Sequence, residues 1–214
     1  MRKIILTLIV LVGMNSVNAQ EQNKTKSNNM RFGLKAGLNI ANLNFSGDVS
    51  PSTNPVPNFH IGAFVEISID EKWAFQPELI YSMQGAKFDM LYVEGTDTYN
   101  TKNTFKLNYL NIPLMFKYNE NKLFFEAGPQ IGFLTSAKLK TEISGLGSGE
   151  QDAKELFKSI DFGLGFGLGY NFTDKLAVNA RYNLGLTNIA ETESGENTEA
   201  KNSVFSFSLA YKFQ

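Results

Sequence analysis

Eight stretches of the chain alternate large apolar residues with small or polar ones at a period of two, and this alternation constrains the fold more than any other feature. Successive side chains of a β-strand point to opposite faces, so the period predicts strands that each have one apolar face. The stretches are Arg31–Ala41, Phe59–Ile69, Trp73–Met83, Phe105–Tyr118, Lys122–Thr135, Ser159–Tyr170, Lys175–Thr187 and Ser203–Phe213. No segment beyond the N-terminal region has a helical period of useful length, and the chain is therefore predicted to be all-β.

The links between these stretches alternate strictly between long and short. The long links are Asn42–Asn58, Gln84–Thr104, Ser136–Lys158 and Asn188–Asn202, and the short links are Asp70–Lys72, Asn119–Asn121 and Asn171–Asp174. An up-and-down antiparallel sheet places every short link at one end and every long link at the other, which is the layout of outer-membrane barrels. Each stretch also reaches the roughly 9 to 11 residues that a tilted strand needs to cross a bilayer. These features predict an eight-stranded antiparallel up-and-down transmembrane β-barrel.

The stretch SIDFGLGFGLGY (Ser159–Tyr170) bears on which face points outwards, because glycines occupy one whole face of it. A soluble, lipocalin-like barrel that binds a ligand would hide the apolar set of side chains and would need many charges outside. The polar face here consists mainly of Gly, Ser and Asn, and an eight-stranded interior is too small for large apolar residues from every strand. The apolar set is therefore predicted to face lipid, and the glycines to face a narrow lumen where they leave room for long charged side chains.

The same parity assigns four cationic and four anionic residues to the lumen. They are Lys35, Glu66, Glu78, Lys117, Glu126, Asp161, Arg181 and Lys212. A charge in a tight interior is costly unless it is paired, so we expect a salt-bridged plug rather than an open pore. A proton or ion path along the carboxylates is the functional alternative. Aromatic residues near the short links are expected to form an interfacial girdle, made of Trp73, Tyr118, Phe125, Tyr170, Tyr211 and Phe213.

Strand register and prolines give two more specific expectations. Residues paired across a hairpin share a face, and a two-residue loop at Glu120-Asn121 would pair Tyr118 with Leu123. Proline lacks the backbone N–H that a ladder needs, and three prolines lie inside predicted strands. We expect bulges or water-satisfied carbonyls at these sites, which are Pro77, Pro113 and Pro129.

The N-terminus has the pattern of an export signal. A short basic region, Met1–Lys3, precedes the apolar segment Ile4–Met14, and small residues then indicate cleavage before Gln20. The apolar segment is much shorter than the roughly 20 residues of a spanning helix. The predicted organisation is a signal peptide over 1–19, a polar disordered lead over 20–30 and an outer-membrane barrel domain over 31–214.

The sequence offers little for catalysis, metal binding or nucleic-acid binding. The chain has no cysteine, a single histidine and a net charge of −1. His60 points inward by parity, whereas a lipid hydrolase would bring a His, a Ser and a carboxylate together at the lipid-facing surface. The glycine-rich pieces lack the spacing and the βαβ context of nucleotide-binding loops. We predict a protein that is not an enzyme and has no cofactor, no metal site and no nucleic-acid partner. The alternatives are a lipid-modifying enzyme of the outer membrane and a soluble ligand-binding barrel.

Three segments carry a family resemblance. YLNIPLMFKY (Tyr109–Tyr118), FFEAGPQIGF (Phe124–Phe133) and DFGLGFGLGYNFTDKLAVNARYNLGLTNI (Asp161–Ile189) resemble the PorT-like outer-membrane β-barrel family of Bacteroidetes-type bacteria. The likeness extends over roughly residues 31–213, and its most specific element, aromatic-x-x-Ile-Pro-Leu, indicates that Pro113 is a family feature.

The resemblance implies an eight-stranded barrel in the cell outer membrane, in a family mostly without assigned activity. Its namesake assists a secretion system, so an accessory role in secretion is one implication, although no residue here marks it. The expected partners are outer-membrane lipids, the barrel-assembly machinery and an unidentified extracellular or secretion-system protein. The four long links are expected to serve a structural, adhesion or interaction role.

Overall fold

The computed structural model describes residues 30–48, 50–94, 97–143, 147–192 and 197–213. Its elements are β1 (Met30–Gly47), β2 (Asn54–Ser68), β3 (Trp73–Glu94), β4 (Asp97–Glu120), β5 (Leu123–Ile143), β6 (Gly147–Asp152), the 3-10 turn η1 (Lys154–Leu156), β7 (Ile160–Asn171), β8 (Leu176–Gly185) and β9 (Thr198–Lys212). The predicted signal peptide over 1–19, and all of the predicted lead except Met30, lie outside these described residues. Within the same ranges, no helix has the length and apolar character to cross a membrane.

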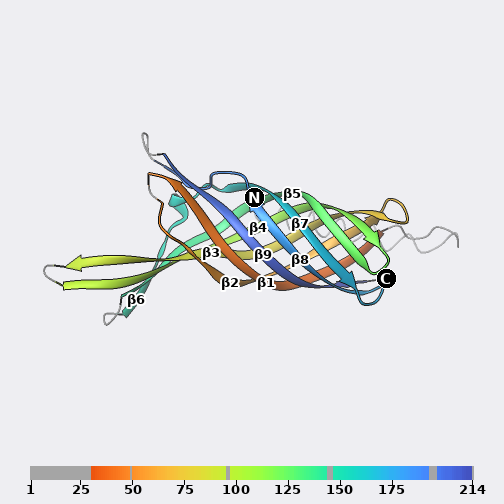
Figure 1. Cartoon of the computed structure of the whole chain (residues 1–214), viewed down its shortest axis with the longest axis horizontal. Coiled ribbons are helices and arrows are strands. Elements are labelled where there is room, and N and C mark those ends of the chain that lie inside the picture. Colours follow the sequence, from red (N-terminus) through yellow and green to blue (C-terminus); the bar gives the residue numbers. More distant parts are fainter. Residues whose placement is uncertain (1–29, 49, 95–96, 144–146, 193–196, 214) are drawn as a thin grey trace, which may run out of the picture.

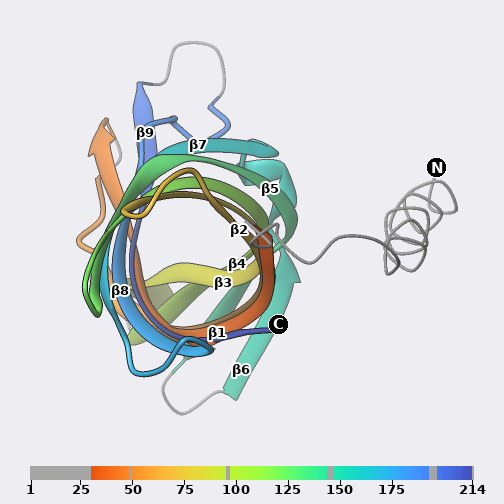
Figure 2. The same ribbon diagram turned by 90° about the vertical axis from the view of Figure 1, so that its right-hand side faces the viewer.

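Eight of the strands close into a barrel. Each pairs antiparallel with two neighbours in the order β1-β2-β3-β4-β5-β7-β8-β9, and β9 pairs with β1 to close the ring. The ring is visible end-on in Figure 2, whereas the short strand β6 pairs with β5 outside the ring (Figure 1). The predicted eight-stranded antiparallel up-and-down barrel is confirmed.

The short links form tight turns at one end of the barrel, where β1 also begins and β9 ends. The predicted register between β4 and β5 is wrong by two residues, because Tyr118 pairs with Phe125 and Glu120 pairs with Leu123. The turn is therefore Asn121-Lys122, and Asn121 adopts a left-handed conformation with φ of 56° that asparagine tolerates in hairpin turns. A shift of two residues leaves every side chain on its predicted face.

The long links are strands over much of their length, which corrects the prediction of long loops. β3 and β4 continue as a two-stranded ribbon to Glu94 and Asp97, and β5 continues to Ile143 before it pairs with β6. Figure 1 shows both ribbons extending beyond one end of the barrel. The strands remain hydrogen-bonded there because backbone pairing does not depend on apolar side chains. A polar segment is therefore predicted to be a loop from its sequence although it folds as a strand.

The three prolines do not cause the bulges that we expected. The β2–β3 ladder is interrupted opposite Pro77, and the β3–β4 and β4–β5 ladders are interrupted beside Pro113 and Pro129, but the register is the same on both sides of each interruption. Each proline, which lacks a backbone N–H, thus interrupts the pairing locally without the extra residue of a β-bulge. The bulges lie elsewhere, between Pro55 and His60 and at the junction of Asn108 and Tyr109.

The two faces of the barrel wall differ as predicted. Large apolar side chains are exposed on the outside of seven of the eight ring strands, for example Leu38 at 66 % and Leu209 at 53 %, and the outward side chains of β8 are half-buried. Lysine, arginine and carboxylate side chains are buried on the inside, for example Lys35 at 4 % and Glu66 at 2 %. An exposed apolar surface of this extent is typical of a surface that contacts a membrane or another protein.

Candidate functional site

The lumen near the short turns holds a carboxylate surrounded by three cations. Glu66 lies on β2, and its carboxylate is 2.7 Å from Lys117 Nζ on β4, 3.0 Å from Lys212 Nζ on β9 and 2.7 Å from Arg31 Nη2 on β1. Lys117 also lies 4.0 Å from the ring centre of Phe124, a cation–π contact. Four strands, β1, β2, β4 and β9, are therefore joined across the inside of the barrel.

A second group of charges lies deeper and is connected to the first. Arg181 donates two hydrogen bonds to the Glu78 carboxylate, at 2.8 and 2.9 Å, and a third to Glu126 at 2.7 Å. Lys35 donates to Glu78 at 2.7 Å. Gln76 donates to Glu78 and accepts from Lys117, so the two groups form one polar network across the lumen.

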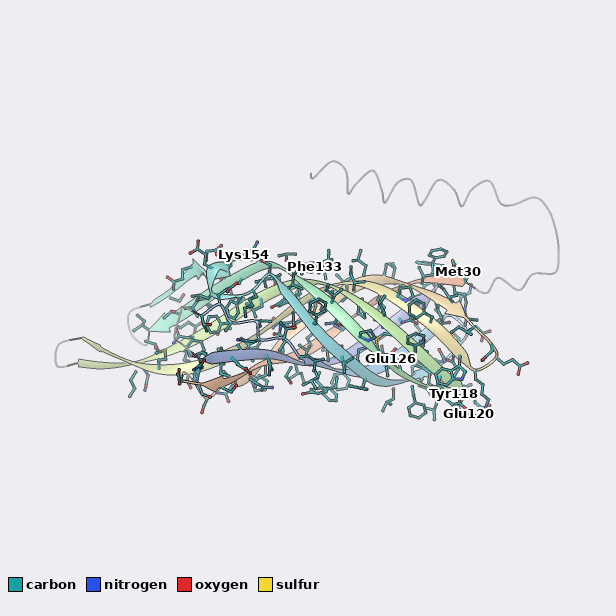
Figure 3. All side chains as sticks on the ribbon, turned by 90° about the horizontal axis from the view of Figure 1, so that it is seen from above. Met30, Tyr118, Glu120, Glu126, Phe133 and Lys154 are labelled. Atoms are coloured by element: carbon teal, nitrogen blue, oxygen red, sulfur yellow. The ribbon has the colours of Figure 1, made fainter. Side chains whose placement is uncertain are left out.

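Asp161 is the one predicted lumen residue that stays apart from this network. Its carboxylate accepts a hydrogen bond of 2.8 Å from Asn202 Nδ2, and among the described residues it forms no ion pair. The structure thus brings seven of the eight residues together and places the eighth farther towards the ribbon end. Figure 3 shows Glu126 between Tyr118 at the short-turn end and Lys154 at the ribbon end.

The glycine stripe of β7 makes room for this network. A Cβ atom on Gly167 would lie 2.8 Å from Glu126 Oε1, and one on Gly165 would lie 3.4 Å from Arg181 Cδ. A Cβ atom on Gly169 would overlap the ring of Phe124. Side chains of neighbouring strands therefore occupy the space that the missing side chains leave.

Towards the ribbon end the interior becomes apolar, a reversal that we did not predict. The inner face there carries a buried apolar cluster, which we name the cap. The cap consists of Leu43, Ala86, Leu107, Tyr109, Leu134, Ala137, Phe157, Ile189, Ala190 and Ala200. The outer face at the same level carries polar residues such as Asn44 and Lys138. A signal for the cap was present in the sequence, because Leu43 continues the inward parity of Lys35 and Leu107 continues that of Lys117.

Two connecting segments complete the cap by folding across the barrel mouth. Phe157, just after η1, pairs with Ala190, and Lys158 N–H donates to Ile189 C=O at 2.7 Å. Ile189 N–H in turn donates to Ala200 C=O on β9 at 2.8 Å. These backbone bonds hold Phe157 and Ile189 inside the mouth, where both are buried.

His60 lies in the lumen between these two regions. Its Nδ1 is 2.8 Å from Asn39 Oδ1 and its Nε2 is 2.9 Å from Ser208 Oγ, so both ring nitrogens have polar partners. It is remote from the outer surface that a lipid substrate would reach. Within the described ranges, no three His, Cys, Asp or Glu side chains are grouped so that they could hold a metal ion.

The residues predicted to form an aromatic girdle gather at the short-turn end. Trp73 is 46 % exposed and packs edge-to-face on Tyr118, with ring centres 5.1 Å apart. Tyr211 and Phe213 make a similar contact at 5.6 Å, and Phe125 is exposed beside its partner Tyr118. Tyr170 contacts Phe172 in the neighbouring turn. This arrangement supports the girdle, which remains a proposal.

The β5–β6 ribbon outside the ring is held partly by Glu150. Hydrogen bonds from Lys106 Nζ and Lys138 Nζ lower the pKa of Glu150 from its ordinary value of 4.5 to about 2. A carboxylate whose pKa is lowered by folding stabilises the folded state at every pH above its ordinary pKa. For Glu150 this contribution is lost as the pH falls from about 4.5 to about 2.

We predict that amide hydrogens of β6 exchange a few-fold more slowly in the parent than in Glu150→Gln near neutral pH. At about pH 2 the difference should be much smaller, because about half of Glu150 is then protonated. Glu155→Gln is the control, with β6 exchange expected to match the parent at both pH values. A pH-independent difference between the parent and Glu150→Gln would contradict the electrostatic explanation.

A closed barrel with an exposed apolar outer surface and a polar lumen defines the class of outer-membrane β-barrel proteins. Residues 18–191 match the family described as outer membrane protein beta-barrel domain, and the chain belongs to this family. No match to a curated protein was found.

Three similar solved structures share little sequence with this chain. Ail, the attachment invasion locus protein of Yersinia pestis, is 13 % identical, with 86 % of this chain and 98 % of Ail covered and a TM-score of 0.43. Neisserial surface protein A is 11 % identical, with 85 % and 97 % covered and a TM-score of 0.46. OprG from Pseudomonas aeruginosa is 14 % identical, with 86 % and 96 % covered and a TM-score of 0.39.

Proposed function

We propose that this protein is a non-conducting, non-enzymatic barrel of the outer membrane, whose ribbons outside the cell provide an adhesion or interaction surface. The observation that carries the proposal is the double closure of the lumen, by the charged network near the short turns and by the cap at the ribbon end. A PorT-like subfamily, export through a cleaved signal peptide at 1–19 and insertion by the barrel-assembly machinery are parts of the same proposal.

The cavities of the barrel support a closed lumen. A cavity of about 410 Å³ opens at the short-turn end and reaches Glu66 and Lys212. Beyond the charged network, a cavity of about 30 Å³ lies beside Arg181 and His60, which is the volume of about one water molecule. The cap lies farther along, so a hydrated ion would have to displace both the paired charges and the apolar side chains.

The ribbons support an interaction role. All six residues of β6 are exposed, and β6 pairs with β5 through one of its edges. A strand at the edge of a sheet offers backbone donors and acceptors to a strand from another protein. Because long connections of outer-membrane barrels face the cell exterior, such a partner would be met outside the cell.

Planar bilayer recordings of the purified full chain test the closed lumen. We expect no stable conductance steps for the parent, nor for Phe157→Ser or Ile189→Ser, because the charged network still blocks a barrel whose cap is loosened. The heat-modifiable gel band of a folded barrel is the control for insertion. Reproducible conductance of the folded parent would contradict the proposal.

A further inference from the structure

Five lysines gather on the outward faces of three adjacent strands, β3, β4 and β5. They are Lys87, Lys102, Lys106, Lys138 and Lys140. Lys106 lies directly opposite Lys138, and Lys87 and Lys140 flank Thr104 on either side. Like charges placed opposite each other destabilise a sheet unless something compensates them. This concentration of cations therefore needs a partner of negative charge.

The lysines lie just beyond the lipid-facing band. Tyr81, Leu110 and Phe133 pair with one another across β3, β4 and β5 and face outwards below the lysines, and on β3 Met83 follows Tyr81 on the same face. Lys106 is four residues farther along β4, about 13 Å along the strand and less in height because barrel strands tilt. The polar headgroup layer begins at the edge of the hydrocarbon core, so long lysine side chains at this level reach it.

The acidic residues near the lysines neutralise them only in part. Glu150 pairs with Lys106 and Lys138, and Lys140 pairs with Glu142. Asp89 lies opposite Lys102 at the far end of the ribbon, and Asp152 lies opposite Lys138 on the β6 side. On the side facing β2, cations exceed carboxylates.

A groove of about 330 Å³ lies on that side, between the start of β2 and the β3–β4–β5 surface. Its charged lining consists of Lys87, Lys106, Lys140 and Glu142. Lys106 is paired with Glu150 and Lys140 with Glu142, so the excess positive charge of the groove is that of Lys87. The remaining lining includes Val56, Pro57, Met83 and Phe105. Ammonium groups beside an apolar floor match a phosphate with the start of its hydrocarbon chains. Met83 in its lining is two residues along β3 from the lipid-facing Tyr81.

We propose that this groove, which we name the lysine groove, binds the phosphate-bearing headgroup of a lipid of net negative charge in the outer leaflet. The acyl chains of the lipid would descend over Tyr81 and Leu110, while the headgroup supplies the missing negative charge. Juxtamembrane lysines attract anionic lipids by this mechanism. The proposal relies on the outward orientation of the ribbons in the proposed function, but it does not depend on the closed lumen.

Because the chain has no cysteine, one engineered cysteine can report on the groove. Asn58→Cys, at the groove, is labelled with a fluorophore, and the full chain is folded into phosphatidylcholine vesicles with a small fraction of doxyl-labelled phosphatidylglycerol or doxyl-labelled phosphatidylcholine. At low salt we expect the anionic lipid to be at least about fivefold enriched at the label, as measured by quenching. Glu71→Cys, in a short turn, should show equal quenching by both lipids.

Charge variants assign the preference to the lysine groove. Lys87→Gln/Lys106→Gln/Lys140→Gln should remove the difference between the two lipids at Asn58→Cys. Lys122→Gln/Lys175→Gln/Lys201→Gln, with the same loss of charge elsewhere, should retain it. Equal quenching in the parent, or a preference that survives in the groove variant, would overturn the proposal. Each variant is first shown to give the heat-modifiable band, so a failed lipid preference is distinct from a failed barrel, and conductance separately tests the closed lumen.

Discussion

Arg181→Met is expected to lower the unfolding free energy of the barrel by about 3–5 kcal/mol or to prevent stable insertion, because it leaves two buried carboxylates without their shared cation. Arg181 is 5 % exposed and binds both Glu78 and Glu126. Lys35 contacts Glu78 but not Glu126, so its ammonium group cannot replace the Arg181 guanidinium that binds both carboxylates. Methionine keeps much of the side-chain volume, and the loss therefore measures charge and hydrogen bonding rather than a cavity.

Urea unfolding of the chain in lipid vesicles, followed by the fluorescence of its single tryptophan, Trp73, measures this effect. Arg31→Met is the matched control, with an expected cost of less than about 1 kcal/mol, since Arg31 is half-exposed and Glu66 keeps two lysines. Adding Glu78→Gln and Glu126→Gln to Arg181→Met should restore much of the stability. Equal losses in Arg181→Met and Arg31→Met would refute the importance of the deep network.

Gly167→Leu is the second substitution with a large expected effect, a loss of at least about 2–3 kcal/mol. A Cβ atom at this position already comes within 2.8 Å of Glu126 Oε1 and of Ala180 C=O, and the carbonyl belongs to the neighbouring strand. A larger side chain would push Glu126 away from Arg181, so the overpacking and the broken ion pair add together.

Gly149→Leu provides the same chemical change where the structure has open space, because a Cβ atom there has no neighbour within 4 Å. Its unfolding free energy should stay within about 0.5 kcal/mol of the parent. The same urea titration measures both variants. A Gly167→Leu protein as stable as Gly149→Leu would mean that the glycine stripe is not required by the charges beside it.

The sequence predicts the faces of the barrel wall well and the extent of its strands poorly. A period of two fixes the side on which Lys35, Glu66 or Arg181 lies, because every second side chain points the same way however the strands are paired. The same property hides the register. Pairing Tyr118 with Phe125 or with Leu123 gives identical faces, and the choice depends on Asn121 adopting a left-handed conformation in the turn.

The cap was missed because alternation says nothing about where the bilayer ends. Beyond the lipid-facing band the outer face is in contact with water. Polar residues therefore occupy the outer face there and apolar residues the inner face, and the strands continue without a break. Leu43 and Leu107 keep the inward parity of the charged residues below them, yet they belong to an apolar interior. The positions of Phe157 and Ile189 depend on two connecting segments meeting across the mouth, which no local pattern encodes.

The cap and the barrel wall should respond differently to cooling. Wall residues such as Leu38 and Leu209 face hydrocarbon, whereas opening the cap would expose apolar groups to water and raise the heat capacity. Attraction that depends on excluding water weakens at low temperature. Cold should therefore loosen the mouth first, while the ion-paired ring stays closed beneath it.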